Sequence, residues 1–166
     1  MSIGAVMQLR SRRFRRRRWW QSFVAVALLL LAHDKPARAS LGDDVSAVAT
    51  DQARFGARLK LVQRARYAVH ELTVPTGATV REFGSDAGKI FAVSWSGGFR
   101  PNLRDLMGAH YDRFVEATRG RRVPRGIVQV EVPGMVVVMG GYLRTFFGYV
   151  VLTDLLPSGV SAEEIR

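Results

Sequence analysis

Short strand-like runs occur in two stretches of the chain, residues 67–95 and 127–152, and apolar residues recur at helical spacing between them. Most of these runs have apolar residues at every second position, whereas MVVVM at 135–139 is apolar on both faces, as a central strand would be. A period of two places alternate side chains on opposite faces of a strand, whereas a period of 3.6 gives one apolar stripe along a helix. Turn residues divide each alternating stretch into three short strands, as in an antiparallel meander. The predicted strands are 67–74, 79–83, 90–95, 127–132, 135–139 and 142–152. Three strands, a helix and three strands predict an α+β domain with an antiparallel sheet of about five to six strands.

Two helices are predicted beside this sheet. The main amphipathic helix begins after Asn102, which can cap its N-terminus, and ends at Gly120. Its apolar stripe consists of Leu103, Leu106, Met107, His110, Phe114 and Ala117. An N-terminal helix is expected within residues 41–66, where Gly42-Asp43-Asp44 places acidic residues at its start. We expect the main helix to pack on the sheet.

The segment before this domain has the three parts of a cleavable signal peptide. Residues 1–22 form a basic n-region that contains the run RRFRRRRWW, and residues 23–32 form a short apolar h-region. A membrane-spanning helix needs about 20 apolar residues, which is more than this segment has. Ala37-Arg38-Ala39 has the small residues of a signal peptidase site, so cleavage after Ala39 is predicted to leave Ser40 as the N-terminus. Residues 40–166 then form a single domain.

The basic charge of the chain is concentrated in this leader. Residues 1–39 carry nine of the 25 Lys and Arg residues and one of the 14 Asp and Glu residues, so they account for +8 of the net charge of +11. The remaining +3 is too small for strong attraction to nucleic acid, and no nucleic-acid partner is expected for the mature domain. We expect the mature protein in the periplasm or secreted, with the membrane contacted only transiently through the leader.

Three alternatives remain open for the leader. It can remain uncleaved as an inner-membrane signal anchor, it can direct twin-arginine rather than Sec export through Ser11-Arg12-Arg13, or translation can begin at Met7. The chain contains no cysteine, so neither a lipid anchor on an N-terminal cysteine nor a disulfide can form. The domain must therefore be stabilised by its core.

Residues with catalytic chemistry are few in the mature domain. His70 and Glu71 are neighbours in a strand and point to opposite faces, and His110 and Asp112 lie about 200° apart around a helix. The strand carboxylates Glu71, Glu82 and Glu131 are expected at solvated positions. We therefore predict no catalytic residues, no metal site and no cofactor. The alternative is a small exported hydrolase or isomerase that uses His70 or His110 with a carboxylate from another strand.

A binding site is expected where tryptophan and arginine adjoin glycine-rich turns. Trp95, Arg104 and Arg144, together with the loop at residues 96–101, are the predicted contacts for a ligand or an envelope protein. Arg144 is unusual because it interrupts an otherwise apolar run. The expected function is that of a non-enzymatic binding or accessory protein.

Several motifs of the mature chain occur together in one known family. They are YAVHELTVPTGATVREF, IFAVSWSG with PNLRDLMG, and GGYLRTFFGYVVLTDLLPSGVSAEEIR. On these motifs the chain resembles DUF2844, a family of exported proteobacterial proteins of unknown function, over essentially the whole mature chain. The resemblance implies export and a single compact domain, and it brings no activity that could be transferred.

Overall fold

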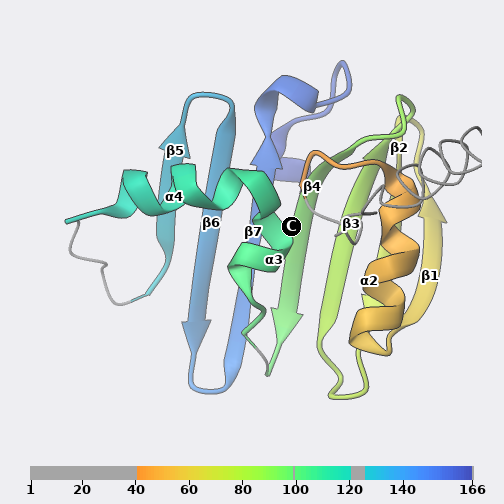
Figure 1. Ribbon diagram of the computed structural model, residues 1–166, viewed down its shortest axis with the longest axis horizontal. Helices are drawn as coiled ribbons and strands as arrows, with labels where there is room; N and C mark the ends of the chain where they lie inside the picture. The colour runs from red at the N-terminus through yellow and green to blue at the C-terminus, as the bar shows by residue number, and fades with distance from the viewer. Residues whose placement is uncertain (1–40, 99, 121–125, 166) are drawn as a thin grey trace, which may run out of the picture. The chain divides into compact units, whose positions relative to one another are not determined.

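The computed structural model describes residues 41–98, 100–120 and 126–165, all of which belong to the second of two units, residues 37–166. In this part of the chain, seven strands form one antiparallel sheet in the order β1-β2-β3-β4-β7-β6-β5 (Figure 1). Their bounds are β1 Arg58–Gln63, β2 Tyr67–Thr73, β3 Thr79–Ser85, β4 Ile90–Gly97, β5 Val128–Val132, β6 Met135–Tyr142 and β7 Thr145–Leu152. The α+β class and the antiparallel sheet are confirmed, with one strand more than the upper bound expected. The predicted leader and its cleavage site, Ala37, Ala39 and Ser40, lie outside the described residues.

Helices cover one face of the sheet. In Figure 1, α2 (Val48–Phe55), α3 (Leu103–Met107) and α4 (Tyr111–Thr118) all lie in front of the strands. The main core fills the space between these two layers, because the apolar positions of the strands alternate and those of the helices form a stripe. Its fully buried members include Val48, Leu72, Val80, Val93, Leu106, Met107, Val137 and Val150.

The predicted N-terminal helix exists but is shorter than residues 41–66. A 3₁₀ turn, η1 (Val45–Ala47), begins where the Asp44 carboxylate accepts a hydrogen bond from the Ser46 amide at 2.9 Å, and α2 follows. Gly56 then takes a left-handed conformation with φ 57°, which ends the helix at Phe55. The extent of the prediction was therefore wrong, because residues 58–63 form the edge strand β1, which pairs with β2.

The main helix is interrupted in the middle. Asn102 caps α3 as predicted, and its side-chain oxygen accepts a hydrogen bond from the Arg104 amide at 3.1 Å. Gly108 departs from helical geometry with φ 51° and ψ −124°, so a 3₁₀ turn, η2 (Gly108–His110), separates α3 from α4. A single continuous helix was therefore wrong, because a glycine readily adopts a backbone conformation that other residues avoid.

The C-terminal residues cover part of the face opposite the helices. After β7 come two 3₁₀ turns, η3 (Thr153–Leu155) and η4 (Ala162–Glu164). Ser161 and Glu164 form a capping box at the second turn. Ile165 is fully buried there in a second small core with Phe83, Phe91 and Val151. This second core therefore lies at one end of the sheet face opposite the helices.

Candidate functional site

Trp95 lies on the helix side of β4 and is only 5% exposed. It pairs with Gly148 of β7 across the sheet. A Cβ on Gly148 would lie 2.8 Å from Trp95 Cε2 and 2.6 Å from the Val138 carbonyl oxygen. The absence of a side chain at position 148 therefore gives the indole its place against the sheet.

Two more glycines in β6 face aromatic rings in the same way. Gly140 pairs with Phe147 and Gly141 pairs with Phe146. A Cβ would lie 2.7 Å from Phe147 Cζ at the first position and 2.8 Å from Phe146 Cδ1 at the second. These glycines were expected to begin a turn, but the turn comes later, at Leu143 and Arg144. The three ring-on-glycine pairs concentrate aromatic surface at one end of β4, β6 and β7.

A cavity of about 290 Å³ lies beside these rings, and we call it the helix-side cavity. Trp95 and Phe146 line it, together with Leu103 of α3 and Met139 of β6. The Arg100 guanidinium stacks on the Phe146 ring, 4.8 Å from its centroid. Among the described residues, the cavity therefore combines apolar walls with one cation, and ligand sites in proteins commonly pair apolar walls with a few polar groups.

One of the three predicted binding residues lines the helix-side cavity. Arg104 does not line the cavity, and its guanidinium lies 4.5 Å from the Tyr111 ring centroid and 3.5 Å from the Asp112 carboxylate. Arg144 is exposed in the turn between β6 and β7 and does not line the cavity either. Its carbonyl oxygen lies 3.4 Å from the position of a Cβ on Gly98, so the turn adjoins the predicted loop. Of the three, only Trp95 lines the cavity.

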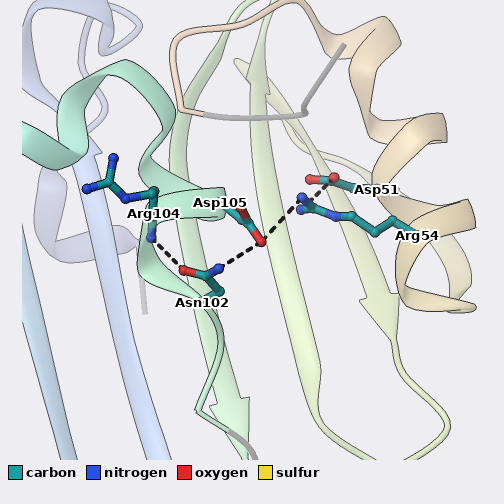
Figure 2. A network of polar contacts seen from close by, with 5 residues as sticks. All are labelled: Asp51, Arg54, Asn102, Arg104 and Asp105. Carbon is teal, nitrogen blue, oxygen red and sulfur yellow. Dashed lines mark hydrogen bonds and ion pairs between the residues drawn. The ribbon is translucent and has the colours of Figure 1, made fainter. Parts of the chain in front are cut away.

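A polar network connects α2 to α3 (Figure 2). Arg54 forms ion pairs with Asp51 of its own helix at 2.8 Å and with Asp105 of α3 at 3.6 Å. Asn102 donates a hydrogen bond to Asp105 at 3.0 Å. Figure 2 shows the Arg104 guanidinium directed away from these groups. The network fixes the start of α3 beside α2.

Beneath this network lies a buried pair of carboxyl groups. Asp51 of α2 and Glu82 of β3 are both 0% exposed, and neither oxygen of Glu82 has a hydrogen-bond donor among the described residues. Burial and the neighbouring Asp51 carboxylate raise the pKa of Glu82 to about 9. Burial also raises the pKa of Asp51, although a hydrogen bond from Glu82 and the charge of Arg54 oppose that rise. At neutral pH, Glu82 is therefore protonated and can donate to Asp51.

This pair was missed in the sequence, where Glu82 was placed at a solvated position. The available signal was Val80, which lies two residues earlier on the same face of β3 and is buried in the main core. The position of Asp51 above that face depends on how α2 crosses the sheet, which local patterns do not specify. Both groups are fully buried, one on α2 and the other on β3.

The described residues include two histidines, His70 and His110, whose rings lie in different surroundings. His70 pairs with Glu82 across β2 and β3, but its Nδ1 is buried without a hydrogen-bond partner in the part of the chain described. The His110 ring lies 3.4 Å from Arg113, measured from Nδ1 to Nη1. Burial lowers the pKa of both imidazoles, and the Arg113 charge adds to the effect at His110. Both rings are therefore held neutral at pH 7.

The described residues contain no group of three or more His, Cys, Asp or Glu side chains that could hold a metal ion. None of their helices has the length and apolar character needed to cross a membrane.

Together these features define a small α+β protein in which a seven-stranded antiparallel sheet carries helices on one face and an aromatic cavity at one end. Residues 37–165 match the model of a family described as a protein of unknown function, DUF2844. The chain belongs to this family, as its motifs indicated. No curated protein and no solved structure matches the chain.

Proposed function

We propose that this chain is an exported envelope protein that binds a ligand or a partner protein at the helix-side cavity and catalyses no reaction. The observation that carries the proposal is the lining of that cavity, where Trp95 and Phe146 meet the stacked Arg100 guanidinium. Hollows of this kind, with apolar walls and few polar groups, are where proteins hold ligands. The exposed Arg104 and Arg144 would extend the contact surface for a protein partner.

The competing proposal is a small exported hydrolase or isomerase based on His70 or His110. The carboxyl group that pairs in register with His70 is Glu82, which is 0% exposed. A general acid or base must reach the atom whose proton it transfers, so this burial counts against a His70–Glu82 mechanism. Arg113, beside His110, is a cation and disfavours the protonated imidazole. Binding is therefore the better-supported proposal.

The cellular address can be tested on the protein recovered from fractionated cells. We expect the soluble periplasmic form to begin at Ser40, because Ala37 and Ala39 provide the small residues that signal peptidase accepts. N-terminal sequencing or intact-mass measurement reads this directly. Ala39→Arg is expected to leave the precursor uncleaved in the membrane fraction. Recovery of an intact N-terminus on a membrane-bound wild-type protein would contradict cleavage.

Photo-crosslinking within the cavity tests the binding proposal. p-Benzoyl-phenylalanine in place of Phe146 is expected to give an ultraviolet-dependent adduct in expressing cells, because position 146 lines the cavity. The same group in place of Leu61 is the control, since Leu61 is 58% exposed on β1, an edge strand that does not line the cavity. Mass spectrometry of the purified chain measures both adducts. Equal yields at the two positions, or no adduct at position 146, would show that the cavity is not the binding site.

A further inference from the structure

The sheet face opposite the helices contains a second hollow, which we call the open-face groove. It has a volume of about 400 Å³, within the range of small-molecule sites. The C-terminal segment covers the neighbouring end of this face through Ile165 and its contacts. The side chains that line the groove include Arg81, Ser94, Ser96, Val138, Phe147 and Tyr149.

The strand register explains why a hollow forms at this position. Ser94 pairs with Arg81 on one side and with Tyr149 on the other, and Tyr149 in turn pairs with Val138. Residues in one register row point to the same face of the sheet. A small serine between an arginine and a tyrosine leaves a depression, with Ser94 at its floor. The groove is therefore a product of side-chain size along one row of the sheet.

Ser94 provides a polar group that the protein leaves unsatisfied. It is only 3% exposed, it lines the groove, and its hydroxyl has no hydrogen-bond partner among the described residues. A buried hydroxyl without a partner destabilises a folded protein, and such groups are uncommon in native structures. A ligand that both donates and accepts hydrogen bonds would satisfy this hydroxyl.

The charged groups that the structure describes at the groove are paired within the protein. Arg81 donates from Nε to the Glu71 carboxylate at 2.8 Å. On β5, the Gln129 amide donates to the Glu131 carboxylate at 2.7 Å. An anionic ligand would have to compete with the Glu71 carboxylate for the Arg81 guanidinium. A cationic ligand would have to compete with Arg81 for that carboxylate. The groove therefore favours a ligand without net charge.

Aromatic surface completes the lining. The Phe147 ring is 38% exposed and faces Gly140, and Tyr149 is half-buried beside Ser94. Aromatic rings pack well against apolar C–H surface, and a tyrosine hydroxyl adds a hydrogen-bonding group at the edge. The groove thus offers an apolar platform next to neutral hydrogen-bonding groups.

We propose that the open-face groove binds a neutral, hydroxyl-bearing ring, namely a sugar unit of a saccharide. The C–H face of the sugar would pack on Phe147 and Tyr149, while one of its hydroxyl groups exchanges hydrogen bonds with Ser94. A purely apolar ligand would leave the Ser94 hydroxyl unsatisfied, and an anion would have no unpaired cation at Arg81. Trp95 and Phe147 border both this groove and the helix-side cavity, whereas Ser94 and Tyr149 line the groove alone. The proposal rests on Ser94 and Tyr149 and does not depend on the function proposed for the helix-side cavity.

Titration of the isotope-labelled protein, in the form recovered from expressing cells, tests this assignment by nuclear magnetic resonance. The probes are cellobiose, lactose and chitobiose, with glucuronate as the charged comparison and cyclohexanol as the comparison that carries a single hydroxyl. We expect saturable shifts of the Ser94, Ser96, Val138 and Tyr149 amide signals with at least one of the three disaccharides. Binding of glucuronate and cyclohexanol is expected to be at least tenfold weaker.

Two pairs of variants connect the binding to the groove. Ser94→Ala is expected to weaken binding by about two- to tenfold, the effect of one hydrogen bond, while the melting temperature stays equal or rises. Ser85→Ala, on the covered end of the same face, is the control and should bind as the wild type does. Phe147→Ala is expected to weaken binding by about tenfold, whereas Tyr142→Ala, which removes a ring that is 78% exposed at the end of β6, should have no effect. Absence of saturable shifts with all three disaccharides, or unchanged binding in a correctly folded Ser94→Ala, would overturn the proposal.

Discussion

Raising the pH from about 7 to about 9 is expected to lower the free energy of unfolding by about 2 kcal/mol, because the folded state must release a proton from a buried carboxyl group. That group is Glu82, whose pKa burial and the Asp51 carboxylate raise from 4.5 to about 9. Over this pH range the unfolded chain has already lost the proton that the folded chain still holds. Stability therefore falls at about 1.4 kcal/mol per pH unit until Glu82 ionises in the folded state.

The direction of this effect follows from the raised pKa. The stabilisation that protonated Glu82 contributes is fully present below pH 4.5 and is lost as the pH rises through about 9. Burial raises the pKa of Asp51 as well, so that group acts in the same direction. His70 and His110 have lowered pKa values, so their contribution to stability rises with pH. This contribution is confined to pH values below about 6.5, the ordinary pKa of histidine. The window from about pH 7 to about pH 9 is therefore where Glu82 dominates.

Urea unfolding at several pH values measures the effect, and Glu82→Gln identifies its source. Glutamine keeps the shape of the side chain and can still donate a hydrogen bond to Asp51, yet it has no proton to lose. We expect Glu82→Gln to flatten the profile and to exceed the stability of the wild type at about pH 9. Glu71→Gln is the matched control, because Glu71 is a half-buried carboxylate on the neighbouring strand β2. A wild-type slope in Glu82→Gln would contradict the assignment.

The parts of the fold that the sequence predicted are those encoded by local pattern. Alternation identified β2, β3 and β4 because strand residues show their burial with a period of two. The capping role of Asn102 was also predicted, since a cap depends on residues within one turn of chain. β1 was assigned to a helix because residues 58–63 carry charged and apolar side chains that fit either structure. Gly56 was the signal that separated them.

The site was less predictable because its parts come from different strands. Trp95 was predicted as a binding residue, but its neighbours in the helix-side cavity arrive through the pairing of β4, β7 and β6. Gly140 and Gly141 were interpreted as turn residues, since glycine pairs are common in turns. In the structure they lie under Phe147 and Phe146. Predicting these pairs requires the strand register, which a single sequence does not specify.

Gly148 is the position where the smallest substitution should have a large effect. A Cβ at this position would lie 2.6 Å from the Val138 carbonyl oxygen and 2.8 Å from Trp95 Cε2. The carbonyl belongs to the adjacent strand β6 and cannot move without disturbing the ladder, while Trp95 is buried against the helices. Gly148→Ala is therefore expected to lower the free energy of unfolding by about 3 kcal/mol, the upper part of the range for overpacked cores.

Chemical denaturation followed by circular dichroism measures this loss without relying on the tryptophan. Gly98→Ala is the control, since a Cβ there would meet, among the described residues, only the Arg144 carbonyl oxygen, at 3.4 Å. It should change stability by less than about 0.5 kcal/mol. In a double-mutant cycle, Trp95→Phe should recover part of the loss in Gly148→Ala, because the smaller ring leaves room for the new methyl group. If Gly148→Ala unfolds within about 1 kcal/mol of the wild type, or if the two substitutions are additive, the indole does not depend on the glycine for its position. In that case Gly148 would not be what orients the Trp95 indole, the largest ring of the helix-side cavity.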